Sequence, residues 1–219
     1  MDISPSDVKL PWTRTWFAFD LDDTLHEFRK ASANASRSNF IAILEAKICH
    51  LDTGTKLTMT MGDLEATYRD TLRSEIANAF TDGRTSDDYR RERFSHLDEA
   101  HSIQLVSELL DKLSVVYRSG LRRALTLKAG ALQVLETPKA RAKKHAQEWT
   151  VTALGLERFI NILDTTNEVR LSKLDGLFRL FSAVSRKYNI APGSMVHIGD
   201  NEQRDVVPAR AEDRYGAIQ

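Results

Sequence analysis

The sequence predicts an α/β protein, in which helices cover a parallel sheet and a block of further helices is inserted into it. In the second half of the chain, short apolar runs alternate with helical segments, which is typical of a parallel sheet. Between the first apolar run and about residue 127, by contrast, apolar residues recur only at helical spacing. We therefore expect the helical block to follow the first strand directly, and the rest of the sheet to come after the block.

The first predicted strand covers residues 15–19, an apolar and aromatic run that stops at Asp20. Its length and its Phe and Trp content are typical of a strand buried on both faces. In the helical block, three sets of apolar residues recur at steps of three and four, and each set would form one apolar stripe on a helix. The sets are Phe40, Leu44, Ile48 and Leu51; Leu64, Tyr68, Leu72, Ile76 and Phe80; and Val106, Leu109, Leu110, Leu113, Val116 and Tyr117. Turn-forming residues at 52–54 and 81–83 predict breaks between helices.

After the block, the expected elements alternate between helix and strand. They are a helix that starts near residue 129, the end of a helix over residues 149–154 closed by Gly155, a strand at 159–163, a helix at 175–188, a strand at 195–198 and the start of an edge strand at 215–219. Like the first strand, the one at 195–198 leads into an acidic residue, Asp200.

Composition and charge exclude several classes of protein. The chain has 219 residues, enough for one large domain or a core with a smaller insert, and its 31 basic and 31 acidic side chains balance. A neutral chain gives no electrostatic reason to expect nucleic acid as a partner. No apolar run approaches the roughly 18 residues of a membrane span. The single cysteine, Cys49, and a start without an apolar signal region favour a cytoplasmic protein.

Acidic residues follow the two best-defined strands. Asp20, Asp22 and Asp23 come directly after the first strand, and Asp200 and Asp205 follow the later one. Ligands of an open parallel sheet bind just beyond the carboxyl ends of its strands, so we expect these carboxylates to meet at one edge. Several carboxylates in one small volume repel each other unless a cation screens them. Oxygen ligands in that number suit a hard ion such as Mg²⁺.

Three motifs, in this order, resemble those of haloacid dehalogenase-like (HAD) phosphohydrolases. They are Phe19-Asp20-Leu21-Asp22-Asp23-Thr24-Leu25, the lysine of Leu171-Ser172-Lys173, and Gly199-Asp200-Asn201 followed by Asp205. The similarity spans most of the chain and implies a Rossmann-like core with an all-helical cap. Residues 1–25 and 127–219 would form the core, and residues 26–126 the cap, which would close over the active site and exclude water.

The resemblance implies a role for each matched residue. Asp20 would be the nucleophile that forms an aspartyl phosphate. Asp22 would be the general acid and base, which protonates the leaving oxygen and later activates water. Thr24 would hold the loop and contact the substrate, and Lys173 would offset the charge of the nucleophile and the phosphoryl group. The Mg²⁺ ligands would be Asp20, Asp200 and the backbone carbonyl of Asp22, and Asp205 would be either a further ligand or a partner that contacts the ligands.

Several of these residues also have a purely structural interpretation. Asp205 could cap a helix that begins near Val206 instead of binding the metal. Thr24 could serve only the loop, and Lys173 taken singly could be a solvated lysine. His26, close to the first motif, is interpreted as a loop residue, and the basic residues 139–144 as a solvated helix face.

The family's second motif, a Ser or Thr after another buried strand, has no counterpart in this sequence. The 19 residues from Glu136 to Leu154 are too few for the end of a helix, a strand, a turn and a further helix, and residues 138–145 are polar and basic. We therefore expect the second core strand to be missing. Losing one hydrogen bond to the phosphoryl group typically costs about 100- to 1,000-fold in rate. One hypothesis is that the strand at 159–163 moves in beside residues 15–19.

We thus predict a Mg²⁺-dependent phosphatase that hydrolyses a small phosphorylated metabolite through an aspartyl phosphate. Asp22 favours phosphate esters, because the dehalogenases of the superfamily lack this second aspartate, and Asp23 weighs against a sugar-phosphate mutase. The alternative from another class is a catalytically inactive protein that binds a ligand or partner. The missing second motif favours this alternative, and the intact Asp20 and Asp22 argue against it. A dehalogenase is a third option, and the oligomeric state is not predicted.

Overall fold

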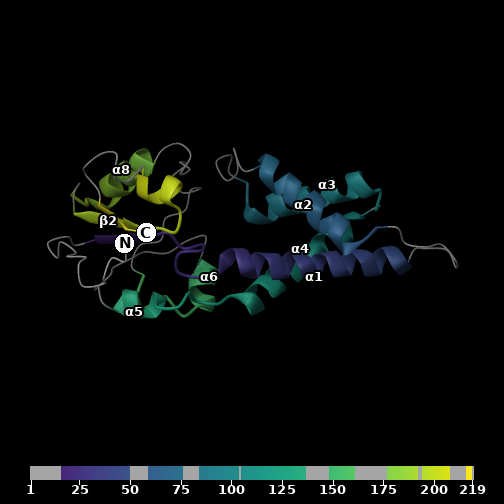
Figure 1. Ribbon diagram of the computed structural model, residues 1–219, viewed down its shortest axis with the longest axis horizontal. Coiled ribbons are helices and arrows are strands. Elements are labelled where there is room, and N and C mark those ends of the chain that lie inside the picture. The colour runs from purple at the N-terminus through teal and green to yellow at the C-terminus, as the bar shows by residue number, and fades with distance from the viewer. Residues whose placement is uncertain are drawn as a thin grey trace, which may run out of the picture.

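The computed structural model describes residues 16–49, 59–75, 84–103, 105–136, 148–160, 177–191, 194–207 and 216–218. At one end of the molecule lies a small sheet with short helices around it, and at the other end lies a bundle of longer helices (Figure 1). In chain order the elements are β1 (Trp16–Phe19), α1 (Phe28–Cys49), α2 (Met61–Glu75), α3 (Ser86–His101), α4 (Ser107–Ala124), α5 (Ala131–Glu136), α6 (Glu148–Ala153), α8 (Leu177–Tyr188), β2 (Met195–Ile198), the π-helical turn η4 (Glu202–Val206) and β3 (Gly216–Ile218). This order confirms the predicted fold class.

The described strands form a parallel sheet in the order β1-β2-β3. β1 pairs with β2 so that Phe19 lies opposite Ile198, and β2 pairs with β3 so that Ile198 lies opposite Ile218. The backbone N–H of Asp20 extends the first pairing by donating to Ile198 O at 2.8 Å. All three strands therefore end at one edge, and the residues that follow β1 and β2 start from neighbouring positions.

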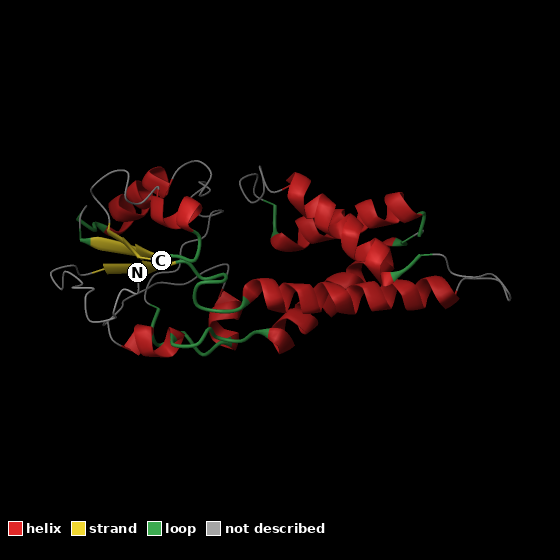
Figure 2. Cartoon of the chain, in the orientation of Figure 1, coloured by secondary structure: helices red, strands yellow, loops and turns green. Residues whose placement is uncertain are grey.

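Helices cover both faces of this sheet. Successive side chains of a strand point to opposite faces, so neighbouring residues of β1 pack against different helices. Trp16 and Ala18 of β1 pack with the cluster around Phe181 of α8. Phe19 packs with a different cluster, which includes Leu135 of α5. Accordingly, α8 lies on one side of the sheet and α5 on the other (Figure 2).

Apolar residues from four helices form the core of the bundle. The buried members of its largest cluster are Phe40, Ile43, Leu64, Tyr68, Phe94, Leu97, Ile103, Leu105, Leu110 and Leu113. α1 and α4 also approach each other closely, since a Cβ added to Gly120 would lie 3.1 Å from Ala35 Cα. Small residues at this crossing therefore set the distance between the two helices. Among the described helices, none is both long enough and apolar enough to span a membrane.

The sequence does not predict α3 as a separate helix, because most of its residues are charged or polar. Its buried residues are Tyr89, Phe94 and Leu97, too few for a clear apolar stripe. The start of α3 is instead set by a capping box. Thr85 Oγ1 accepts from the Asp88 backbone N–H at 3.2 Å, and the Asp88 carboxylate accepts from the Thr85 backbone N–H at 2.7 Å. These bonds satisfy donors that the first turn of a helix leaves unpaired.

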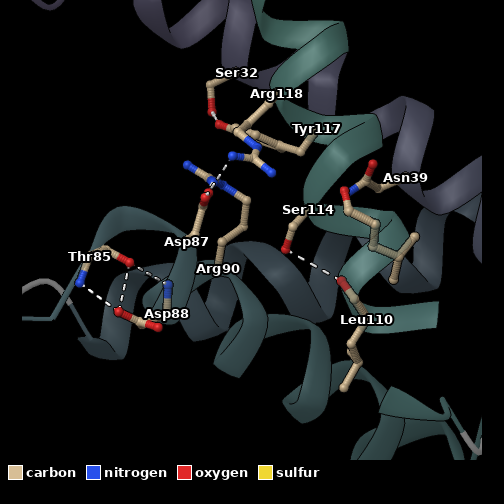
Figure 3. A network of polar contacts seen from close by, with 11 residues as sticks. Ser32, Asn39, Thr85, Asp87, Asp88, Arg90, Leu110, Ser114, Tyr117 and Arg118 are labelled. Carbon is tan, nitrogen blue, oxygen red and sulfur yellow. Dashed lines mark hydrogen bonds and ion pairs between the residues drawn. The ribbon is translucent and has the colours of Figure 1, made fainter. Parts of the chain in front are cut away.

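Next to this cap, polar contacts join α3 to α4 and α1 (Figure 3). Asp87 forms ion pairs with Arg90 and, at 3.4 Å, with Arg118 of α4. The guanidinium of Arg90 lies 4.0 Å from the centre of the Tyr117 ring, and the Tyr117 hydroxyl lies 2.8 Å from Ser32 Oγ of α1. The network therefore orients three helices of the bundle relative to one another.

The two segments that enter and leave the bundle run side by side, and we call residues 25–27 and 126–128 the paired linkers. Two hydrogen bonds join them: Glu27 N donates to Thr126 O at 2.9 Å and Lys128 N donates to Leu25 O at 3.0 Å, and together they form an antiparallel bridge between His26 and Leu127. The sequence divides the chain into residues 1–25 with 127–219 and residues 26–126, and this division falls on the paired linkers. That the two parts are separate domains stays a prediction.

Two expectations about the middle of the sheet concern residues that are described only in part. Residues 137–147 lie outside the described residues, so the absence of the second core strand stays a prediction. Of the strand expected at 159–163, Phe159 and Ile160 are described, and the expectation is wrong for these two, which are not in a strand. Their backbone N–H groups donate to Leu156 O at 2.9 and 3.2 Å, which closes a turn after α6. A pairing of residues 161–163 with β1 stays a prediction.

Candidate active site

Three carboxylates gather at the carboxyl edge of the sheet. Asp20 follows β1 directly, and Asp200 follows β2 after one glycine. The parallel pairing of β1 with β2 places these two residues on neighbouring strand ends. Asp205 comes from η4, the turn that follows. One carboxylate oxygen of each residue lies within 4.8 Å of the others, so residues far apart in the sequence share one small volume.

Asp205 is fixed in place by its own turn. Its side chain is buried, and its carboxylate accepts a hydrogen bond from the Asn201 backbone N–H at 3.1 Å and lies 3.3 Å from His197 Nε2. The Asp205 backbone N–H in turn donates to Asn201 O at 2.7 Å. A Cβ added to Gly199 would lie 2.4 Å from Asp205 Cγ, so a glycine is required there. Asp205 lies within η4, and Val207, directly after this turn, is helical, so the choice between a metal ligand and a helix cap stays a prediction.

The loop after β1 is held by contacts within the first motif. Thr24 Oγ1 donates to Asp20 Oδ2 at 3.3 Å, so Thr24 touches the predicted nucleophile. Leu25 N donates to Leu21 O at 3.0 Å and closes the loop as a turn. Asp23 adopts a left-handed backbone conformation with φ of 59°, which Asp tolerates better than most residues. Leu21 is buried, and it anchors the loop to the cluster below the sheet.

Asp22 lies beside the carboxylate group without joining it through its side chain. Its Oδ1 lies 2.9 Å from His26 Nε2, and 38% of the Asp22 side chain is exposed. The resemblance assigns the Asp22 backbone carbonyl to the metal, and that assignment stays a prediction. Lys173 lies outside the described residues, so its predicted role is a prediction as well.

Arg29, in the first turn of α1, brings a positive charge to this edge. Its Nε lies 3.1 Å from Asp23 Oδ2 and its Nη2 lies 3.4 Å from Asp200 Oδ2. Its backbone N–H also donates to Asp23 Oδ1 at 3.0 Å. The side chain is 73% exposed, so solvent weakens both ion pairs. The first helix of the bundle thereby reaches the carboxylates of the sheet.

The donor set fits a hard divalent cation. Asp20, Asp200 and Asp205 offer oxygen atoms alone, and carboxylates this close repel one another unless positive charge lies between them. Mg²⁺ is commonly held by a few carboxylates together with water and substrate phosphate. The arrangement can therefore bind such an ion and present it to a phosphate or another anionic group at the sheet edge.

Comparison with known proteins gives the same fold. No family model and no curated protein matches the chain. Among solved structures, the HAD-hydrolase YfnB from Bacillus subtilis, bound to magnesium, matches with 21% identity and a TM-score of 0.57, over 88% of this chain and 82% of its own. A 2-haloacid dehalogenase from Pseudomonas syringae pv. Tomato DC3000 matches with 19% identity and a TM-score of 0.57, over 90% and 83% of the two chains. A HAD phosphatase from Thermococcus onnurineus matches with 16% identity and a TM-score of 0.54, over 90% and 82%.

The chain has the fold of the haloacid dehalogenase-like hydrolases. This confirms the fold that the three motifs imply. The similar structures include both a phosphatase and a dehalogenase, so the HAD-like fold leaves the reaction to be argued from the site.

Three residues of the site are not found by the sequence analysis. His26 lies in the segment between β1 and α1, as interpreted, but the sequence analysis does not predict that it is fully buried against Asp22. Arg29 contacts Asp200, which is 171 positions away, and no local sequence pattern predicts such a contact. His197 lies in β2 beside Asp205, and its polar side chain inside an apolar strand was a usable signal. Each of the three contacts a carboxylate of the first or the third motif.

Proposed function

We propose that the chain is a Mg²⁺-dependent hydrolase that removes phosphate from a small phosphate monoester through an aspartyl phosphate. The observation that carries this proposal is the convergence of Asp20, Asp200 and Asp205 within 4.8 Å of one another. Asp22, two residues after Asp20, lies beside them with part of its carboxylate open to solvent. Phosphoryl transfer requires a nucleophile, an acid and charged groups that stabilise the phosphoryl oxygens.

The proposed hydrolysis of the phosphate ester has two chemical steps. The Asp20 carboxylate attacks phosphorus, a new P–O bond forms, and the bond from phosphorus to the ester oxygen breaks. Asp22, protonated at this stage, gives its proton to the leaving oxygen. In the second step the Asp22 carboxylate takes a proton from water, the water oxygen forms a bond to phosphorus, and the bond between phosphorus and the Asp20 oxygen breaks, which releases inorganic phosphate. Asp20 then returns to its free form, and Asp22 is protonated again.

The residues that would hold Mg²⁺ are Asp20, Asp200 and Asp205, with the Asp22 backbone carbonyl. A bound ion supplies positive charge that offsets the repulsion between the Asp20 carboxylate and the anionic phosphoryl group. The chain's own part is to fix those carboxylates: Thr24 contacts Asp20, and the η4 turn holds Asp205. Lys173 would add a further positive charge, as the resemblance implies.

The helical bundle favours a small substrate over a large one. We propose that residues 26–126 act as a cap that closes over the sheet edge, excludes water and limits substrate size. The paired linkers place the bundle directly after the catalytic loop, and Arg29 brings its first helix to Asp200. These features favour a small phosphorylated metabolite as the substrate.

Hydrolysis of a halogenated acid is the second candidate, since one of the similar structures is a 2-haloacid dehalogenase. Both reactions begin with attack by the residue at the position of Asp20. They differ in the leaving group, because halide leaves without a proton whereas an alkoxide needs one. The presence of Asp22 therefore favours the phosphate ester.

Release of phosphate from p-nitrophenyl phosphate, with Mg²⁺ and with EDTA, tests the proposal. We expect turnover by the wild type with Mg²⁺ alone and a loss of at least about 1,000-fold in Asp20→Asn, as for removal of other nucleophiles. Asp70→Asn is the matched control, because Asp70 is 74% exposed on α2 and pairs with Arg73. Equal background release by wild type and Asp20→Asn contradicts the proposal and favours an inactive binding protein. Halide release from a 2-halo acid in place of phosphate release favours the dehalogenase.

A further inference from the structure

His26 is the buried group that contacts the proposed acid and base. Its side chain is fully buried, its Nε2 lies 2.9 Å from Asp22 Oδ1, and its ring packs edge-on against Phe28 with centroids 5.9 Å apart. Asp22, by contrast, is 38% exposed. A buried imidazole thus contacts one oxygen of a carboxylate whose side chain is partly exposed.

The hydrogen-bonding pattern defines which ring nitrogen carries the proton. Among the described residues, His26 Nδ1 has no hydrogen-bond partner. A proton on Nδ1 would leave a buried N–H unpaired and would turn a lone pair of Nε2 toward the carboxylate, and both cost free energy. The neutral ring with its proton on Nε2 avoids both, because a carboxylate only accepts. His26 therefore donates to Asp22.

The backbone of His26 is held from two sides. It forms a parallel bridge with Asp22 and an antiparallel bridge with Leu127 in the paired linkers. The bridge with Leu127 consists of the bonds from Glu27 N to Thr126 O at 2.9 Å and from Lys128 N to Leu25 O at 3.0 Å. The imidazole consequently has little freedom to follow Asp22, and Asp22 is oriented by the imidazole.

We propose that His26 is a positioning residue that orients Asp22 for proton transfer to the leaving group. This inference rests on the function proposed above. With Oδ1 engaged by His26, Oδ2 is the oxygen that delivers the proton, and a general acid acts only within about 2.6–3.2 Å of its target. Without His26, the Asp22 carboxyl group can still transfer a proton, but it is no longer held in the orientation that reaches the leaving oxygen.

The test compares His26→Leu and His26→Gln on two substrates. p-Nitrophenyl phosphate has a leaving group that needs little protonation, and ethyl phosphate has one that requires a proton. General acid catalysis contributes about 100- to 10,000-fold, so loss of orientation should cost His26→Leu about 10- to 100-fold in kcat on ethyl phosphate. We expect a clearly smaller loss on p-nitrophenyl phosphate, a nearly unchanged KM, and partial rescue by His26→Gln, whose amide keeps an N–H donor.

Two further variants separate positioning from a structural role. His26→Leu combined with Asp22→Asn should be no slower on ethyl phosphate than Asp22→Asn alone, because the two residues act as one unit. His96→Leu is the matched control, since His96 lies 3.6 Å from Glu99 on the exposed side of α3 and should leave both rates unchanged. Equal losses on both substrates, or equal losses in His26→Leu and His26→Gln, overturn the proposal.

A measurement that does not depend on activity keeps the contact testable if a variant fails to fold. In ¹⁵N-labelled wild type, the His26 ring should show the Nε2–H tautomer, and Asp22→Ala should change its nitrogen shifts. The Nδ1–H tautomer, or shifts insensitive to Asp22→Ala, contradicts the positioning role. An inactive wild type with the Nε2–H tautomer instead refutes the proposed function and leaves the contact intact.

Discussion

Replacing Gly199 by alanine tests how tightly the third motif is built. The added Cβ would lie 2.4 Å from Asp205 Cγ, 2.5 Å from Asp205 Cβ and 2.6 Å from Asp205 Oδ2. Carbon atoms in contact lie about 3.5–4.0 Å apart, so something must move by about 1 Å. A change of rotamer does not relieve the clash, because the Cβ of Asp205 itself is too close. The η4 turn, held by the bond from Asp205 N to Asn201 O at 2.7 Å, must shift as a whole.

This displacement sets the size of the expected effect. Inserting a methyl group into a packed site typically costs about 1–3 kcal/mol in the free energy of unfolding. Mg²⁺ tolerates little change in ligand distance, and loss of supporting contacts around a metal typically weakens affinity by about 10- to 100-fold. We expect both effects in Gly199→Ala.

Calorimetric titration with Mg²⁺ and thermal unfolding with and without Mg²⁺ measure these quantities. Mg²⁺ should raise the unfolding temperature of the wild type and have little effect on Gly199→Ala. Gly62→Ala is the control, because its Cβ would meet Thr60 Oγ1 at an ordinary 3.6 Å and Gly62 lies in α2. That variant should be stabilised by up to about 1 kcal/mol with unchanged Mg²⁺ affinity. Wild-type affinity and stability in Gly199→Ala would refute the reasoning.

Three further predictions concern charge, packing and pH. Arg29→Gln should raise Mg²⁺ affinity, because the Arg29 guanidinium lies 3.4 Å from Asp200 and competes with the ion. The increase should be up to about fivefold, which is the effect of an exposed ion pair. A lower Mg²⁺ affinity of the variant in the calorimetric titration would contradict this prediction. Gly120→Val should lower the free energy of unfolding in urea by about 1–3 kcal/mol without changing Mg²⁺ affinity, since its side chain meets α1. The hydrogen bonds from Thr85 hold the pKa of Asp88 below its ordinary 3.8. Stabilisation by this cap is therefore present above about pH 4 and is lost as the pH falls through the lowered pKa, so the stability difference between wild type and Thr85→Ala should shrink in acid.

The edge of the sheet could be predicted from the sequence because its signals are local. An apolar run that stops at Asp20 and another that leads into Asp200 define two parallel strand ends, and parallel strands place their carboxyl ends together. The charged helix α3 could not be predicted in the same way, since its fold depends on a cap at Thr85 and on three buried side chains. The sequence cannot distinguish the turn at Phe159 and Ile160 from a strand, because a short apolar run fits both equally well.

The remaining contacts of the site depend on tertiary structure. His26 is paired with Leu127, which lies beyond the whole bundle in the sequence. Arg29 meets Asp200 because α1 starts beside the end of β2. A single histidine or arginine carries no periodic signal, so these partners become visible only when the chain is folded.

The paired linkers have a consequence for how such a chain can diversify. Because Glu27 and Thr126 are one hydrogen bond apart, everything between them is topologically a loop whose ends already touch. Such a stretch can be transplanted, shortened or exchanged with little strain on the strands that carry Asp20 and Asp200. Residues 27–126 could thus be replaced as one contiguous segment while the strands and their carboxylates stay unchanged.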